Sequence, residues 1–456
     1  MYKKILIASL ALIAGLASCK KDDPTPSPNP PSTLTIDGVA STLEFYQLDT
    51  AHLSVAGVAK DAAAKAVWVV NGAKAAEGAT FDFTTAHPGK YEITLTVDGK
   101  SAKQTYTVAP RFSEGTFLLN EGNFGNETGS LTYIHPSKKL VIDQAYYRVN
   151  GTKLGNVCQD LAFGNDQIYI LSQLGPKNGG EGLLTIARSN SLEKVKVYND
   201  EALAQSTPTH IAVLRDHIYI RTERDGILRG SSEGGFTPIT GTKKALKQRM
   251  AQIGERLFAL TSDSKVLMIQ GTQVVRELDL SPAKPSGIAV SHDGKLWVST
   301  TSPNAILKVD PTPDNFVALD THILDKSISA TGPESWQRTT SSAFFAHGDK
   351  LYFTGQSSVI YCHDFATSKT SQVIDVKTID GVGTSANMYY NSLGVDPSTG
   401  ELYYAAFEGY STYNKKNVTM VLKADGTKLL LKEKVNSFPA GFYFIPNAAS
   451  RTGANR

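Results

Sequence analysis

The sequence predicts an all-β protein, a seven-bladed β-propeller preceded by a small immunoglobulin-like β-sandwich. The main observation is a short strand pattern, an aliphatic residue beside an aromatic one, that recurs six times at intervals of about 40 to 55 residues. Its copies are Ile168–Ile170, Ile218–Ile220, Leu257–Ala259, Leu296–Val298, Leu351–Phe353 and Leu402–Tyr404. A second apolar run precedes each copy across a turn. Such β-meanders cannot bury both faces alone, so we expect them to stack radially.

The two ends of the repeat region supply a seventh blade. Gly115–Asn120 and Ser130–Ile134 have the pattern of second and third strands without a first, whereas Ala440–Ile445 has the pattern of a first strand without a successor. We expect the C-terminal strand to pair beside Gly115–Asn120 and to close a propeller over residues 113–447, with a disordered tail at 448–456. Closure removes the open sheet edges. A two-sheet sandwich is the alternative, but it would be large for one domain and does not explain the repeat.

The N-terminus predicts export and lipid attachment. Two lysines precede an apolar stretch that is too short to span a bilayer and is typical of a signal peptide, here residues 1–18. Leu16–Cys19 resembles a bacterial lipobox, so we expect lipidation of Cys19, with a buried helical cysteine as the alternative. Lys20–Asp23 resembles the export signal that sends lipoproteins of Bacteroidota to the outer face of the outer membrane.

A spacer and a second domain follow the predicted lipid anchor. Residues 19–33 contain five prolines, which favour extended polyproline conformations and a semi-rigid linker. Residues 34–110 then show the alternation of β-strands. Within them, Trp68–Gly72 and Pro88–Val97 resemble the tryptophan strand and final hairpin of a PKD-type immunoglobulin-like domain. We expect this domain to act as a spacer, with binding of carbohydrate or of a partner as the alternative.

Composition is that of an ordinary extracytoplasmic globular chain. The formal net charge is +3, and removing residues 1–18 with their two lysines leaves +1. Nothing in this balance favours nucleic acid as a partner. Cys158 and Cys362 fall in different repeats, too far apart for a disulfide, and we expect both to be small buried residues. They cannot build a metal site.

The predicted topology gathers two kinds of loop around the central funnel, namely those that enter each innermost strand and the hairpins between second and third strands. The candidate ligand-binding residues in these loops are Asn120, Glu121, Asn123, Phe124, Asn156, Gln159, Asp160, His210, Arg249, Trp336, Arg338, Tyr389, Tyr390, Asn391 and Tyr410. The set is rich in amides and aromatic rings and poor in carboxylates. Amides both donate and accept while aromatic rings supply contact area, so the set suits a neutral or zwitterionic ligand.

Several of these residues have a structural alternative. Trp336 could fill a gap between blades, and one of Tyr389 and Tyr390 could belong to the core. His210 precedes a buried strand, where a histidine is more often structural than a ligand, and Asp160 could cap a turn.

An enzymatic function has little support in the sequence, and we expect none. Propeller lactonases of the gluconolactonase type hold a divalent cation with a glutamate, asparagines and an aspartate. Glu121, Asn156, Asp160 and Asn391 could supply those atoms, but no spacing ties them together. Nucleophile triads, phosphate-binding glycine loops and quinone or haem signatures are absent from the sequence.

The segment Gly115–Gly125, the later Asp-Gly and Asp-Pro turns, the lipobox and the PKD-like segment together resemble a family of Bacteroidota surface lipoproteins with YVTN-like seven-bladed propellers. Some members capture cobalamin at the cell surface and pass it to the TonB-dependent cobalamin transporter. The resemblance, over about residues 113–446, implies a surface-facing outer-membrane lipoprotein. We expect it to bind a small nutrient, with cobalamin or a related corrinoid favoured, and to deliver it to a TonB-dependent transporter. The alternative is an adhesion or scaffold lipoprotein that binds glycan or protein.

Overall fold

The computed structural model describes residues 33–40, 43–328, 344–355, 357–388 and 393–446. Within these ranges the strands form the two sheets of an N-terminal β-sandwich and seven four-stranded sheets. The first sandwich sheet has the order β1 (Thr35–Gly38), β3 (Thr50–Ala56), β6 (Thr80–Thr84). The second has the order β2 (Phe45–Tyr46), β8 (Lys100–Ala109), β7 (Gly89–Val97), β4 (Val67–Val70), β5 (Ala73–Glu77).

Trp68 on β4 is the centre of the sandwich core. Its side chain is fully buried, and its indole Nε1 donates a hydrogen bond to the carbonyl of Gly78 at 2.9 Å. The indole also packs on Phe81 at a ring distance of 5.6 Å. A buried tryptophan whose single hydrogen-bond donor is satisfied can pack between two sheets without the desolvation penalty of an unpaired polar group. The immunoglobulin-like sandwich predicted from the tryptophan strand is therefore confirmed.

The remaining strands form seven blades, each an antiparallel meander in which neighbours in sequence are neighbours in the sheet. Blade 1 contains β36 (Pro439–Phe444), β9 (Thr116–Asn120), β10 (Ser130–His135) and β11 (Leu140–Ile142). Blade 2 contains β12 (Asn156–Gly164), β13 (Gln167–Gly175), β14 (Leu184–Arg188) and β15 (Lys194–Tyr198). Blade 3 contains β16 (Pro208–Leu214), β17 (His217–Thr222), β18 (Gly226–Ser231) and β19 (Gly234–Pro238).

The other four blades follow the same plan. Blade 4 contains β20 (Ala251–Ile253), β21 (Arg256–Leu260), β22 (Lys265–Gln270) and β23 (Gln273–Asp279). Blade 5 contains β24 (Lys284–Val290), β25 (Leu296–Thr301), β26 (Ala305–Val309) and β27 (Ala318–Ile323). Blade 6 contains β28 (Phe344–His347), β29 (Lys350–Thr354), β30 (Val359–Asp364) and β31 (Lys369–Asp375). Blade 7 contains β32 (Leu393–Val395), β33 (Leu402–Phe407), β34 (Asn417–Leu422) and β35 (Lys428–Glu433).

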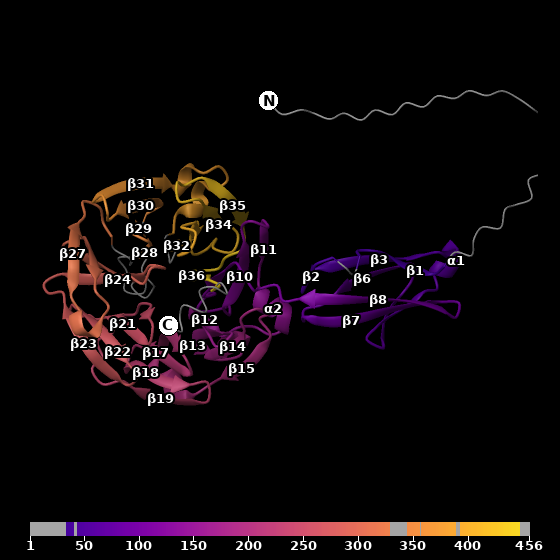
Figure 1. Ribbon diagram of the computed structural model, residues 1–456, viewed down its shortest axis with the longest axis horizontal. Helices are drawn as coiled ribbons and strands as arrows, with labels where there is room; N and C mark the ends of the chain where they lie inside the picture. The colour runs from indigo at the N-terminus through magenta and orange to yellow at the C-terminus, as the bar shows by residue number, and fades with distance from the viewer. Residues whose placement is uncertain (1–32, 41–42, 329–343, 356, 389–392, 447–456) are drawn as a thin grey trace, which may run out of the picture. The chain divides into compact units, whose positions relative to one another are not determined.

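Figure 1 shows the blades around one centre, with their first strands innermost and their fourth strands at the rim. Short helices occupy the connections. They are α1 (Lys60–Ala63) in the sandwich, and α2 (Ala145–Asn150), α3 (Glu201–Ser206), η1 (Lys177–Gly179), η2 (Pro313–Asn315), η4 (Val376–Thr378) and η5 (Gly383–Ala386) in the propeller. The all-β propeller predicted from the repeats is confirmed, with seven blades in the part of the chain that the structure describes.

The ring closes between the two ends of the chain. In blade 1, β36 pairs antiparallel with β9, and its register places Phe442 opposite Leu118 and Tyr443 opposite Phe117. Just beyond β36, the amide of Ile445 donates to the carbonyl of Gly115 at 3.0 Å. The predicted pairing of the C-terminal strand with Gly115–Asn120 is therefore confirmed.

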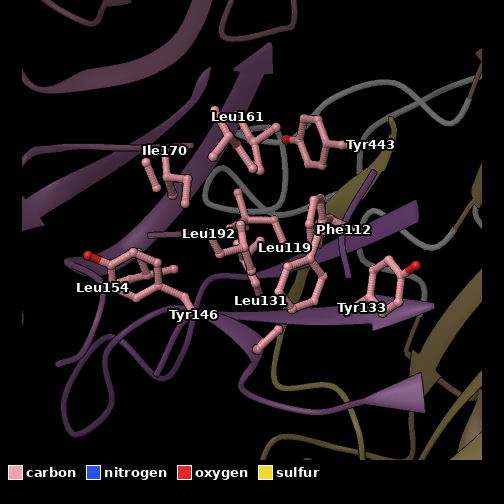
Figure 2. Packing of buried hydrophobic residues seen from close by; sticks show 14 of the residues in the cluster. Phe112, Leu119, Leu131, Tyr133, Tyr146, Leu154, Leu161, Ile170, Leu192 and Tyr443 are labelled. Carbon is pink, nitrogen blue, oxygen red and sulfur yellow. The ribbon is translucent and has the colours of Figure 1, made fainter. Parts of the chain in front are cut away.

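The blades hold together through apolar layers between neighbouring sheets. The layer between blades 1 and 2 joins residues of β9, β10, β12, β13 and β36, including Leu119, Leu131, Leu161 and Ile170 (Figure 2). Phe112 packs edge-on against Tyr133 at a ring distance of 5.0 Å in the same layer. Because both faces of each sheet are covered, the central residues of the second strands are apolar on both faces, as in Phe117–Leu119 of β9 and Leu257–Leu260 of β21.

Four blades meet at the carboxylate of Asp160, in β12. Its Oδ1 accepts a hydrogen bond from the hydroxyl of Tyr443 at 2.7 Å, and its Oδ2 accepts one from the amide of Ile211 in β16 at 2.9 Å. Arg249, just before β20, places Nε 3.2 Å from Oδ1 and its guanidinium carbon 4.0 Å from the Tyr443 ring centroid. Burial raises the pKa of Asp160, and the charge of Arg249 opposes that shift.

Asp160→Ala should therefore destabilise the propeller. The substitution leaves the Arg249 cation and two buried donors without their common acceptor, which typically costs about 3–5 kcal/mol of unfolding free energy. Urea denaturation followed by circular dichroism measures this loss. The matched control is Asp216→Ala, at an exposed position in the β16–β17 turn. Equal midpoints for the two variants would contradict the structural role of Asp160.

Candidate functional site

The propeller has two faces that differ in the loops they carry. We define the entry face as the end that carries the loops leading into each first strand and the hairpins between second and third strands. The opposite face carries the hairpins between first and second strands. The antiparallel order of every blade puts these two loop sets at opposite ends of the ring. The structure describes ten of the sequence-predicted residues, which lie in loops of the entry face or in the strands that these loops connect. They are Asn120, Glu121, Asn123, Phe124, Asn156, Gln159, Asp160, His210, Arg249 and Tyr410.

Four of these residues form a buried polar layer beneath the entry face. The amide nitrogen of Asn120 donates to the hydroxyl of Thr132 at 3.3 Å, and its Oδ1 accepts from the amide of Ser437 at 3.0 Å. Gln159 Nε2 donates to the Glu121 carboxylate at 2.8 Å. Asn156 Nδ2 donates to a backbone carbonyl of the β9–β10 hairpin. These side chains support the loops above them, since buried amides that bond within the fold fix loop geometry.

Asn156 also has an unmatched acceptor. Its Oδ1 is buried and has no hydrogen-bond partner in the described part of the chain. A buried acceptor of this kind is expected to meet a water or a ligand donor.

Two sequence-predicted aromatic residues lie at the surface of the entry face. Phe124, in the β9–β10 hairpin, is 62% exposed, and Lys177 Nζ lies 4.9 Å from its ring centroid. Tyr410, in the β33–β34 hairpin, is 41% exposed and stacks on Phe438 at a ring distance of 5.7 Å. Phe438 also packs on Tyr413 at 4.6 Å. We use the name aromatic patch for the ring cluster of Tyr410, Phe438 and the buried Tyr413, together with Phe124 on the neighbouring hairpin, whose ring contacts Lys177 of blade 2.

Glu127 joins the two hairpins that carry the patch. One carboxylate oxygen accepts a hydrogen bond from the hydroxyl of Tyr413 at 2.7 Å, and the other accepts one from Ser437 Oγ at 2.8 Å. The sequence prediction missed Glu127, Tyr413 and Phe438. The signal was present, because all three lie in a hairpin or entry loop of the same type as the predicted residues.

Asn123 shapes the β9–β10 hairpin. Its Oδ1 accepts a hydrogen bond from the amide of Gly125 at 3.1 Å, and its carbonyl accepts one from the amide of Glu127 at 2.9 Å. This side-chain turn holds Phe124 at the tip of the hairpin.

A polar hollow of about 680 Å³ lies beside the β33–β34 hairpin on the entry face. It is lined by residues 377–385, 415–417 and 433. Lys416 pairs with Glu408 at 2.8 Å, and Thr384 donates to the same carboxylate at 2.7 Å. The entry face therefore combines an aromatic patch with a charged hollow, an arrangement suited to a ligand with both apolar and polar parts.

His210 and Asp160 lie deeper, at the centre of the ring. His210 is buried, and its Nδ1 lies 3.2 Å from the hydroxyl of Thr209. Burial lowers the pKa of His210 well below its usual value, and the charges of Arg221, Lys247 and Arg249 add to the shift. The imidazole is therefore neutral at physiological pH.

No three His, Cys, Asp or Glu side chains are grouped to hold a metal ion in the described ranges. The carboxylates of Glu121 and Asp160, which the lactonase alternative would use, are paired with Gln159 and Arg249. Cys158 is buried, as predicted, whereas Cys362, which was also predicted to be buried, is half-buried; both are free thiols.

Six predicted residues lie outside the described residues. They are Cys19, Trp336, Arg338, Tyr389, Tyr390 and Asn391. Of the helices that the structure describes, none has the length and apolar character needed to cross a membrane.

Comparison with solved structures shows the fold. A quinonprotein alcohol dehydrogenase-like protein from Bacteroides thetaiotaomicron has a TM-score of 0.56 at 15% identity, covering 92% of this chain and 98% of that one. A protein from Lactobacillus plantarum reaches 0.47 at 13% identity, covering 73% of this chain and 99% of that one. BamB from Moraxella catarrhalis reaches 0.42 at 9% identity, covering 72% and 85%. At these identities the likeness concerns the fold alone.

The curated proteins contain no match to this chain. A family match does exist, to the domain of unknown function DUF5074, and it spans residues 114–446. These residues run from just before β9 to just after β36, the two strands whose pairing closes the ring, and so include the whole propeller. The chain belongs to the DUF5074 family.

Proposed function

We propose that this protein is a lipid-anchored surface protein that captures a small nutrient on the entry face of its propeller and passes it to a TonB-dependent outer-membrane transporter. Cobalamin or a related corrinoid is the favoured ligand. The observation that supports capture is the aromatic patch, where Phe124 and Tyr410 expose large ring surfaces on two hairpins held together by Glu127. Exposed aromatic surface on fixed loops commonly marks a binding site.

The chemistry of the patch suits a large ligand with an apolar body and polar arms. Aromatic rings supply flat contact area, and Asn123 lies beside Phe124 in the same hairpin. The polar hollow beside the β33–β34 hairpin offers lysine and carboxylate groups to the arms of such a ligand. A corrin ring with amide side chains and a nucleotide loop has this combination.

An adhesion or scaffold function is the second candidate. It is favoured by a separate observation on β27, the outermost strand of blade 5, where Leu319 and Ile323 are exposed, as is Val317 just before the strand. An edge strand with exposed apolar side chains is a surface on which another protein can add a strand. This candidate places the contact at the rim of the propeller and not on the entry face.

Substitution of the patch tests ligand capture. Losing an aromatic anchor in a binding site typically costs about 2 kcal/mol, so Phe124→Ala and Tyr410→Ala should each weaken cyanocobalamin binding by about thirtyfold. Isothermal titration of the chain lacking residues 1–33 gives the affinities. Leu319→Ala, at an equally exposed apolar position on β27, is the matched control and should bind as the wild type does. No binding by the wild type would reject cobalamin, and no hit in a corrinoid and glycan panel would favour the scaffold function.

The proposed anchoring has its own test. Cys19→Ala removes the lipid acceptor, so the protein should move from the membrane fraction to the soluble fraction. Replacing Asp22 and Asp23 by alanine should leave the protein lipidated but facing the periplasm. Cell fractionation and protease treatment of intact cells measure the two outcomes. A wild-type protein that protease never reaches on intact cells would contradict the surface location.

A further inference from the structure

A cavity of about 180 Å³ lies in the central channel of the propeller, towards the opposite face. Its wall comes from the innermost strands of four blades, β24, β28, β32 and β36, with side chains that include Ile288, Val290, Phe345, Val395, Phe442 and Phe444. Apart from Phe345, these residues occupy the later parts of their strands, near the hairpins of the opposite face. The cavity is therefore distinct from the aromatic patch, which lies at the other end of the ring.

One cation borders this apolar wall. Arg249 lines the cavity, and its side chain is 23% exposed although it sits at the centre of the ring. Its terminal nitrogens make long contacts with backbone carbonyls, 3.3 Å to Phe442 and 3.4 Å to Ala440. Its Nε lies 3.2 Å from Asp160 but is not aligned for a hydrogen bond. The guanidinium thus keeps capacity to donate to a further acceptor.

Gly441 makes room for this guanidinium. A Cβ at position 441 would lie 1.9 Å from Arg249 Nη2, and Gly441 has φ +142, a conformation that other residues rarely adopt. The strand that closes the ring, β36, therefore has a glycine at the point where the Arg249 side chain reaches the channel.

Three cations, Arg221, Lys247 and Arg249, lie near the channel centre. Arg221, which is largely buried, donates to the carbonyl of Ala245 and to Thr209. Lys247 pairs with Glu223 at 3.0 Å, and Arg249 pairs with Asp160. Burial is the main cause of the lowered pKa of His210, and the charges of Arg221, Lys247 and Arg249 all add to that shift. An anion entering the cavity would meet an attractive potential.

We propose that the channel cavity is a second binding site, which takes a small aromatic monocarboxylate with its ring among the apolar side chains and its carboxylate against Arg249. The size fits, because an apolar cavity of about 150 Å³ in another protein holds benzene. An apolar wall with one guanidinium matches a ligand with one apolar ring and one charge, and a guanidinium pairs with a carboxylate in a planar geometry. This site goes beyond the capture of a nutrient on the entry face and does not depend on it.

Benzoate and benzyl alcohol are the probes that test this site in the chain lacking residues 1–33. Benzoate should bind the wild type with a Kd near or below about 1 mM, a modest affinity for a ligand of this size. Benzyl alcohol, which has the ring without the charge, should bind at least about tenfold more weakly, because hydrogen bonds to charged groups are the stronger ones. Isothermal titration measures both.

Two variants separate the parts of the site. Val290→Trp fills the cavity from the wall and should abolish benzoate binding, whereas Val195→Trp, the same change at an exposed position on β15, should leave it unchanged. The double variant Asp160→Asn/Arg249→Gln removes both charges of the pair together and should remove the preference for benzoate over benzyl alcohol. Circular dichroism establishes that each variant is folded.

Three results would overturn the proposal. They are the absence of saturable benzoate binding by the wild type, an equal affinity of the wild type for benzoate and benzyl alcohol, and unchanged benzoate binding by Val290→Trp. Cyanocobalamin binding by Val290→Trp should equal that of the wild type, so a failure of the channel site is distinguishable from a failure of capture on the entry face.

Discussion

The pairing of β36 with β9 is the interaction on which the rest of the propeller depends. It joins the last described strand of the chain to the first strand of the repeat region, so that blade 1 has four strands like the other six blades. The same pairing delivers Tyr443 to Asp160 and places Ser437 and Phe438, the residues just before β36, beside Glu127 and Tyr413. The central polar cluster and the aromatic patch are both consequences of ring closure.

Ring closure also separates two chemical environments. On the entry face, amides and carboxylates are largely used to fix loops, and aromatic rings are left at the surface. In the channel, apolar side chains of four blades surround a cavity, and Arg249 supplies charge at its border. The cost of holding Arg249 and Asp160 away from water is offset by their mutual attraction and by the hydrogen bonds that Asp160 accepts. A buried pair that links four blades also fixes how those blades meet.

Much of the fold could be predicted from the sequence, because a propeller repeats one strand pattern and the second strands carry it most strongly. The missing strands at the two ends were enough to predict the pairing of Phe442–Ile445 with Gly115–Asn120. The site was harder to predict. Topology identified the loops that contain Asn120, Glu121 and Phe124, but the sequence pattern does not distinguish an amide that bonds within the fold from one that faces solvent. Glu127 was missed because its partners Tyr413 and Ser437 are about three hundred residues away in the chain.

The central claim is that the entry face, through its aromatic patch, captures the ligand. Hydrogen–deuterium exchange of the chain lacking residues 1–33, with and without cyanocobalamin, tests it most directly, because exchange reports the stability of each backbone segment. The account predicts slower exchange in residues 121–129 and 408–416, the two hairpins that Glu127 joins, with no change in the hairpins of the opposite face at 291–295 and 347–350. Slower exchange confined to the opposite face, or no change in any segment, would contradict it.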